Sequence, residues 1–280
     1  MMLLVDGAWL ESRLSDPDLR VIDASWYLPA QKRDARAEYA AAHIPGAIHL
    51  DLSSDLADAG AKLRNSVASP DALARVFASR GIGNAHHVVV YDRLGGFSAG
   101  RVWWTLRYAG HERVSLLDGG FAAWVAEGRP VTEEVPSFPP AAFRARPRPE
   151  LLRDKADVLR IVREGGAQIV DARSAERFRG EGEEHTRRKG HIPGSRSVPY
   201  DRNLRGDPPS FKSLAELRDV YARAGVDLER PIVTTCGSGV TAALDAFALA
   251  LLGHRNVSVY DGSWAEWGDC DDVPIASGDQ

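Results

Sequence analysis

One cysteine occupies a position that suits a nucleophile. Cys236 lies within "IVTTCGSGVTAALDAFALALLG", between a short apolar run and a segment with helical spacing. Gly237, Ser238 and Gly239 are small, so successive backbone N–H groups can converge on the sulfur just ahead of a helix N-terminus. Such a position favours thiolate over thiol. A cysteine that only fills space needs neither two glycines nor a strand-to-helix junction, so we predict that Cys236 is a nucleophile.

The residues after Cys236 exclude one class of cysteine chemistry. A cysteine phosphatase needs an arginine six positions after its cysteine to hold the phosphate oxygens, and that position is Ala242. Without this charge, phosphoryl transfer is disfavoured. The remaining chemistry moves sulfur, because a thiolate can attack a divalent sulfur and become a persulfide. The other cysteine, Cys270, lies among three aspartates that oppose a thiolate, and we assign it no chemical role.

The elements that position Cys236 belong to a repeat. "VIDASWY" at Asp23 recurs as "IVDARSA" at Asp171, and "HIPG" occurs at both His43 and His191. The order of further matching segments is the same in both halves, which indicates a duplicated domain. Each of these two histidines and two aspartates has a counterpart in the other half, so we interpret them as structural. Asp171 could also orient Arg177.

Short apolar runs alternate with helical patterns in each half, which predicts an α/β fold of tandem domains with a mostly parallel central sheet flanked by helices. The proline-rich stretch between the halves can form neither a helix nor a central strand. We therefore predict an N-terminal domain over residues 1–130, a linker over 131–149 and a C-terminal domain over 150–280. Asp92 takes the place of Cys236 in the first half, and a carboxylate cannot carry a persulfide. The second half is therefore the catalytic one.

Composition narrows the possible partners. The formal net charge is −4, which favours neither a nucleic acid nor an anionic membrane. No apolar run is long enough to span a bilayer, and the start of the chain does not resemble a signal peptide. Two cysteines outside any Cys-x-x-Cys motif argue against structural zinc and dithiol redox chemistry. We expect a cytoplasmic protein without a metal or an organic cofactor.

The paired "HIPG" segments, "DGGFAAW", "DGSWAEW" and "CGSGVTA" together resemble the two-domain rhodanese family over nearly the whole chain. The "CGSGVT" loop is most similar to that of the 3-mercaptopyruvate sulfurtransferases. The resemblance implies two rhodanese-like domains, of which only the C-terminal one is catalytic. It also implies that Ser238 assists Cys236 and that Arg177 binds the substrate. Either Arg187 or Arg188 would bind the substrate carboxylate, with Arg188 slightly favoured. Further substrate-binding positions fall on the loop at Gly237, Gly239, Val240 and Thr241.

We therefore predict a sulfurtransferase that takes sulfur from a small anionic donor, 3-mercaptopyruvate, through a Cys236 persulfide. The acceptor would be cyanide or a thiol, with a thioredoxin-like protein as one candidate. Two alternatives stay open: a thiosulfate:cyanide sulfurtransferase, and a non-catalytic persulfide carrier or regulatory module. A loop without Arg or Lys gives dianionic thiosulfate little Coulombic help, which favours mercaptopyruvate.

Overall fold

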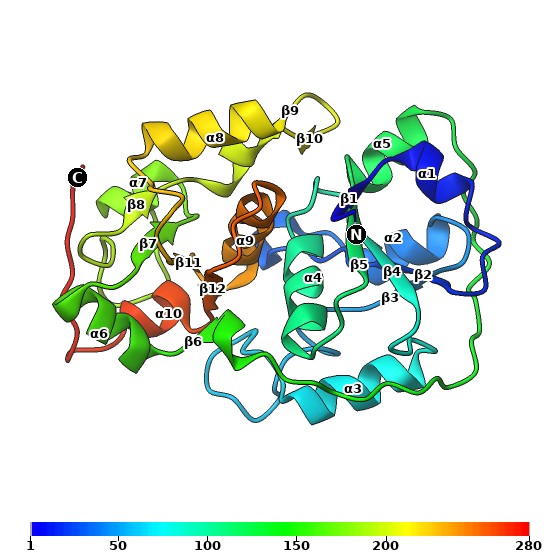
Figure 1. The fold of residues 1–280 in the computed structure, drawn as a ribbon, viewed down its shortest axis with the longest axis horizontal. Helices are drawn as coiled ribbons and strands as arrows, with labels where there is room; N and C mark the ends of the chain where they lie inside the picture. The colour runs from blue at the N-terminus through cyan, green and yellow to red at the C-terminus, as the bar shows by residue number, and fades with distance from the viewer. Residues whose placement is uncertain (1, 280) are drawn as a thin grey trace. The chain divides into compact units, whose positions relative to one another are not determined.

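The computed structural model describes residues 2–279, and its chain divides into two compact units. The first is made by the chain as far as Ala59, by Val67–Arg148 and by Gly206–Phe211, and the second by Gly60–Ser66, Pro149–Arg205 and the chain from Lys212 onward. Each unit contains one five-stranded sheet in which neighbouring strands run parallel (Figure 1). The predicted α/β fold of two similar domains is confirmed.

The sheet of the first unit has the strand order β1-β5-β4-β2-β3. Its bounds are Leu4–Val5 (β1), Leu19–Asp23 (β2), Ala47–His49 (β3), His87–Tyr91 (β4) and Val114–Leu117 (β5). Its helices are Gly7–Glu11 (α1), Pro29–Gln31 (η1), Ala35–Ala41 (α2), Pro70–Ser79 (α3), Ala99–Tyr108 (α4) and Gly120–Ala126 (α5). A buried cluster that includes Leu10 of α1 and Trp124 of α5 joins both helices to the sheet. The strands are short and apolar because helices cover them.

The second sheet repeats the first in the order β6-β12-β11-β7-β8. Its bounds are Leu152–Arg153 (β6), Gln168–Asp171 (β7), Arg196–Ser197 (β8), Ile232–Thr235 (β11) and Val257–Tyr260 (β12). The helices are Pro149–Leu151 (η2), Lys155–Glu164 (α6), Ala175–Arg179 (α7), Tyr200–Asn203 (η3), Leu214–Arg223 (α8), Val240–Leu251 (α9) and Ser263–Trp267 (α10). Leu204–Arg205 (β9) and Ser210–Phe211 (β10) form a separate two-stranded sheet.

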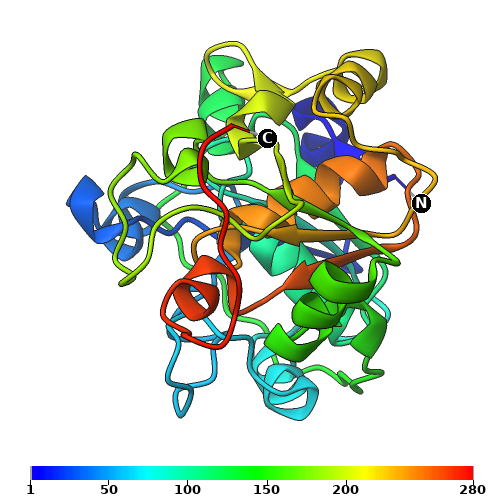
Figure 2. The ribbon, with the colours of Figure 1, turned by 90° about the vertical axis from the view of Figure 1, so that its left-hand side faces the viewer.

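Helices cover both faces of the second sheet. Val158 of α6 and Trp264 and Trp267 of α10 lie in one buried cluster with side chains of β7, β11 and β12. The helix α9 packs along β11 and β12 on the opposite face (Figure 2). Nine of its twelve residues are buried, which explains why its sequence is apolar on nearly every side.

The two His-Ile-Pro-Gly segments have the structural role predicted for them. Nδ1 of His43 lies 2.8 Å from the carbonyl oxygen of Tyr39, and Nδ1 of His191 lies 2.9 Å from that of Phe178. Both histidines are buried, and each stacks on the aromatic residue that it bonds. The imidazoles therefore tie the turns before β3 and β8 to the preceding helices.

The proline-rich segment 131–149 has no helix or strand before η2 begins at its end, although Thr132 makes an isolated bridge with His43. Along residues 2–279, none of the helices has both the length and the apolar character that a bilayer crossing requires.

Candidate active site

Cys236 is the first residue after β11 and is 2% exposed. All four residues of β11 are buried, so the strand is fixed between β7 and β12 and its carboxyl end is held in place. Gly239 adopts a φ of 76° at the N-cap of α9, where a side chain would be strained. The cysteine thus lies in a tight turn between a buried strand and a buried helix, as the sequence predicts.

The start of α10 fixes the backbone of the cysteine loop. The N–H of Cys236 donates to Oγ of Ser263 at 3.1 Å, and its carbonyl oxygen accepts from the N–H of Trp264 at 2.9 Å. The carbonyl oxygen of Gly237 accepts from the N–H of Ala265 at 2.9 Å. Ser263 has a φ of 50°, an uncommon value for a residue other than glycine. The sequence alone does not reveal the role of Ser263; the one signal for it is that "DGSW" differs from "DGGF" at this position before the aromatic residue.

The first unit shows how this kind of loop binds an anion. Asp92 follows β4 as Cys236 follows β11, and Oδ1 of its carboxylate accepts from the N–H groups of Leu94 and Gly96, each at 2.8 Å. Its Oδ2 accepts from the N–H groups of Ser98 at 2.7 Å and Ala99 at 2.8 Å. Four amides therefore converge on the side chain at the strand's exit. Asp92 is a built-in anion in the place where the second unit has a sulfur.

The two loops differ in length. The helix α4 begins seven residues after Asp92, whereas α9 begins four residues after Cys236. The carbonyl oxygen of Asp92 accepts from the N–H of Phe121 at 2.9 Å, just as that of Cys236 accepts from Trp264. The anchor to the following helix is therefore common to both repeats. The shorter second loop is the one that carries the thiol.

Arg177 lies directly beside the cysteine loop. A Cβ atom built on Gly237 would lie 3.1 Å from Nη2 of Arg177, so a side chain there would push the guanidinium back by a few tenths of an ångström. The guanidinium donates to both carboxylate oxygens of Glu184, at 2.9 and 2.8 Å, and the side chain is 35% exposed. Arg177 is thus oriented by Glu184 and still open to solvent, and it is the predicted arginine that the structure brings to the cysteine loop.

A buried ion network lies behind Arg177. Arg173 bonds both oxygens of Asp171, and its Nη1 donates to Glu184 at 2.8 Å. Burial alone lowers the pKa of Arg173, but the negative charges of Asp171 and Glu184 outweigh it and raise that pKa. The guanidinium also stacks on Trp264, 4.3 Å from the ring centroid. The expectation that Asp171 could orient Arg177 is wrong, because Asp171 binds Arg173 and Glu184 orients Arg177.

The arginines before the second His-Ile-Pro-Gly segment face another part of the unit. Arg187 donates to Oδ1 of Asp271 at 3.0 Å and to the carbonyl oxygen of Asp269, and its side chain is 60% exposed. Nη2 of Arg188 donates to the carbonyl oxygen of Val273 at 2.9 Å. The hydrogen bonds of both guanidinium groups therefore go to the segment after α10 and not to the cysteine loop. Arg187 and Arg188 are close to Arg177 in sequence, but the fold directs their side chains toward the segment after α10.

The remaining loop residues differ in how accessible they are. Ser238 is partly buried, and within residues 2–279 its hydroxyl has no hydrogen-bond partner. Val240 is 3% exposed and Thr241 is partly buried. Cys270 has a neighbour that its sequence context hides, since Nζ of Lys155 lies 3.4 Å from its sulfur. Ser238 therefore places a hydroxyl group that has no partner in the described chain two residues after Cys236.

A buried carboxyl group lies on α9 behind the cysteine. Asp245 is 0% exposed, and its Oδ1 accepts from Nδ2 of Asn203 at 2.7 Å. Burial raises the pKa of Asp245 well above its usual value, and the proximity of Cys236 adds to the rise. Oδ2 of Asp245 and Oδ1 of Asn203 are both buried without a partner in the described chain. The hydrogen bond from Asn203 lowers that pKa, but burial outweighs it, so the neutral acid is favoured and its proton supplies a donor at this buried acid–amide pair.

The fold and the cysteine loop together define a class of protein. The chain belongs to the rhodanese-like family, whose domain model matches residues 6–127 and 154–270. The predicted resemblance and the repeat are confirmed.

Relatives indicate what kind of enzyme this is. The chain is 39% identical to the 3-mercaptopyruvate sulfurtransferase of Escherichia coli over 274 residues, which cover 97% of this chain and 96% of the relative. It is 42% identical to the thiosulfate sulfurtransferase of Cricetulus griseus over 274 residues, which cover 94% and 91%. The crystal structure of SseA from Escherichia coli matches with a TM-score of 0.87 at 38% identity, covering 94% of this chain and 99% of that one. The chain is thus an enzyme of the sulfurtransferase kind, which acts on a small sulfur donor and an acceptor.

Proposed function

We propose that this enzyme transfers sulfur from 3-mercaptopyruvate to a thiol or to cyanide through a persulfide on Cys236. The Cys236 thiolate attacks the donor sulfur, an S–S bond forms and the C–S bond breaks. The bonding electrons leave on carbon as the enolate of pyruvate, which takes a proton to give pyruvate. An acceptor thiolate or cyanide then attacks the outer sulfur, and Cys236 leaves as a thiolate.

The observation that carries the proposal is the relation between Cys236 and Asp92. In the first unit the residue at the strand's exit is a carboxylate that accepts four backbone N–H groups. The repeat places Cys236 at the same point of the second sheet, ahead of α9. A loop of this kind stabilises a negative charge on the side chain it surrounds, which is what the thiolate and the anionic persulfide require.

The proposed substrate-binding residue is Arg177, whose planar guanidinium beside Gly237 suits a carboxylate. Gly237, Gly239, Val240 and Thr241 would line the donor's site along the loop, and the free hydroxyl of Ser238 would donate to the donor's sulfur or carbonyl oxygen. Arg188 and Arg187 are weaker candidates, since reaching the donor would require each to leave its hydrogen bonds to the segment after α10.

The choice of donor rests on charge. Thiosulfate carries two negative charges and would meet a loop without Arg or Lys, beside an arginine already paired with Glu184. The 42% identity to a thiosulfate sulfurtransferase keeps thiosulfate as the second candidate. Measuring kcat/KM for both donors with cyanide as the acceptor distinguishes them. We expect mercaptopyruvate to be faster, and faster turnover of thiosulfate would overturn the assignment.

The persulfide step is tested separately by intact mass. Mixing the protein with mercaptopyruvate should add one sulfur atom, and the adduct should be absent from Cys236→Ser. If the adduct forms but no acceptor removes it catalytically, the protein is a persulfide carrier and not an enzyme. An adduct that persists in Cys236→Ser would remove Cys236 from the mechanism.

The proposal assigns distinct roles to the parts of the chain. Residues 150–280 form the catalytic domain, 1–130 a non-catalytic domain and 131–149 a linker. The acceptor in the cell would be a small thiol or a thioredoxin-like protein. A cytoplasmic location fits two free cysteines, because thiols stay reduced there.

A further inference from the structure

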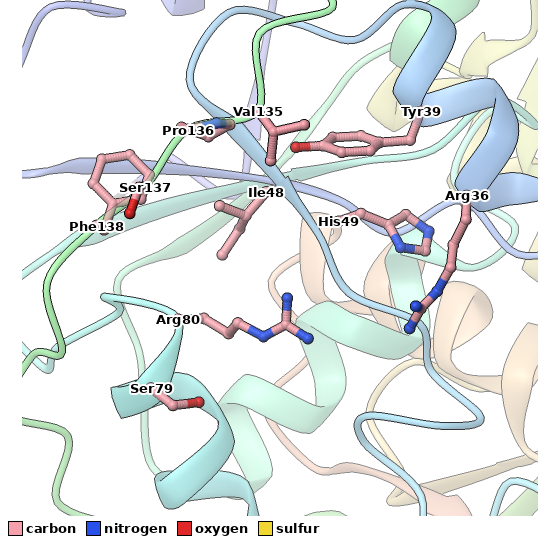
Figure 3. A pocket seen from close by; sticks show the side chains of 10 residues that line it. All are labelled: Arg36, Tyr39, Ile48, His49, Ser79, Arg80, Val135, Pro136, Ser137 and Phe138. Atoms are coloured by element: carbon pink, nitrogen blue, oxygen red, sulfur yellow. The ribbon is translucent and has the colours of Figure 1, made fainter.

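A cavity of about 360 Å³ opens at the edge of the first unit's sheet, beside β3. Tyr39, Ile48 and His49 line it and are each 7–8% exposed, while the segment 135–138 contributes a further wall (Figure 3). This volume is within the range of sites for small molecules. The sulfur chemistry described above uses none of these residues.

Two arginines give the cavity its charge. Arg36 comes from α2, and Arg80 follows α3. Their guanidinium ends point toward one another across the space beside His49 (Figure 3). Arg80 donates to Oδ1 of Asp55 at 3.3 Å, whereas the guanidinium of Arg36 has no hydrogen bond or ion pair within residues 2–279. Among the residues that the structure describes, no carboxylate lines the cavity. The guanidinium of Arg36 is therefore available to bind an anion in the cavity.

His49 adds a hydrogen-bonding group. Its Nε2 lies 3.2 Å from the carbonyl oxygen of Ser25, which can only accept, so Nε2 carries the proton of the neutral ring. Nδ1 has no partner in the described chain and presents its lone pair. Tyr39 donates its hydroxyl proton to the carbonyl oxygen of Ala47 at 2.7 Å and offers mainly its ring. The cavity thus combines cations, an acceptor and apolar surface.

The second unit has a corresponding cavity of about 400 Å³ beside β8. In the repeat, Ser197 takes the place of His49 and Arg223 the place of Ser79. Arg179 lines this second cavity, but Glu181 binds it at 2.8 Å and Asp279 lies 3.9 Å from it. The fold creates the space in both units. Arg36 in the first cavity and Arg223 in the second both lack a hydrogen bond or ion pair within residues 2–279, so the first cavity is distinguished by His49, whose place Ser197 takes in the second.

We propose that the cavity of the first unit binds a small carboxylate that also carries a hydroxyl or amino group. The carboxylate lies between Arg36 and Arg80, the hydroxyl or amino group donates to Nδ1 of His49, and the apolar part packs against Ile48 and Phe138. Arginine suits this role because its fork accommodates carboxylate geometry.

Calorimetric titration of the full-length protein tests the proposal with two probes of matched shape. Mandelate has a carboxylate, a hydroxyl group and an apolar ring, and phenylacetate lacks the hydroxyl. We expect mandelate to bind one site and phenylacetate to bind several-fold more weakly. Arg36→Ala should weaken mandelate binding about tenfold or more, because a charge-assisted contact is lost.

Arg179→Ala is the matched control, since it removes an arginine from the cavity of the second unit. It should leave mandelate binding unchanged. Arg36 is exposed and alanine favours a helix, so Arg36→Ala should fold normally. Equal affinity in wild type and Arg36→Ala, or an equal loss in Arg179→Ala, overturns the site. Equal affinity for the two probes overturns the role of His49.

Discussion

Asp245 links the stability of the second unit to pH. Its pKa is raised by burial and by the proximity of Cys236, so the folded protein holds a proton that the unfolded chain releases above a pH of about 4. The change we consider is Asp245→Asn. Asparagine has the shape of the protonated acid, and like that acid it accepts from Nδ2 of Asn203 through its oxygen and carries a donor of its own. The variant therefore keeps the hydrogen bond from Asn203 but has no group that titrates at position 245.

The sign and size of the pH effect on the free energy of unfolding follow from the linkage between folding and proton binding. For an acid whose pKa is raised on folding, the stabilisation is complete below the pKa of the unfolded state and is lost as pH rises toward the pKa of the folded state. With one extra proton bound in the folded state, the free energy of unfolding falls by about 1.4 kcal/mol per pH unit in that window. The variant lacks this loss. Between pH 5 and pH 6 its free energy of unfolding should therefore gain about 1.4 kcal/mol relative to wild type.

The assay is urea unfolding of wild type and Asp245→Asn at pH 5, 6 and 7, with Asp219→Asn on the exposed side of α8 as the control. The difference between Asp245→Asn and wild type should grow with pH until the pH reaches the pKa of the folded state. The control should give the same difference at every pH. A constant difference for Asp245→Asn would mean that the carboxyl is already ionised in the folded protein, which would refute the acid–amide pair.

Three further changes test the site and its counterpart in the first unit. Arg177→Lys should lower kcat/KM for mercaptopyruvate about tenfold, because an ammonium cannot form the two parallel bonds by which Glu184 orients the guanidinium. A loss no larger than that of Arg187→Lys contradicts the assignment. Asp92→Asn should reduce the free energy of unfolding by about 1–3 kcal/mol, since the amide turns a donor toward N–H groups, and unchanged stability in urea would dispute the carboxylate's role. Glu184→Gln should lower the free energy of unfolding by about 3–5 kcal/mol in the same assay, because the buried Arg173 loses a charged partner. A decrease below about 1 kcal/mol counts against the network.

Much of the fold can be predicted from local patterns. The apolar runs that became β7, β11 and β12 are short and are bounded by helical segments, and this alternation is typical of parallel sheets. The repeat doubled the information, because each half supports the interpretation of the other. It also identified Asp92 as the counterpart of Cys236, and with it the unit that lacks the thiol.

The polar network around the site could not be predicted in the same way. The segment "EGEEHTRRK" reads as a solvated charge run, yet Glu184 within it has a side chain only 2% exposed and bonds Arg173 and Arg177. Arg187 and Arg188 follow Glu184 closely within the same segment, but their guanidinium groups bond the segment after α10. A segment of mixed charges has no sequence periodicity that distinguishes a buried ion pair from an exposed one. Which of its side chains are buried is therefore set by the folded backbone.

By itself, the sequence determined the chemistry of this protein. A thiol between a buried strand and a buried helix, with glycines on both sides of Ser238, is a property of neighbouring residues and is visible in the chain. Tertiary structure alone decided which groups surround that thiol. Ser263 binds the N–H of Cys236, and Asn203 binds the carboxyl of Asp245, across 27 and 42 positions of sequence. Such contacts depend on how separate elements pack, and no local pattern specifies that packing.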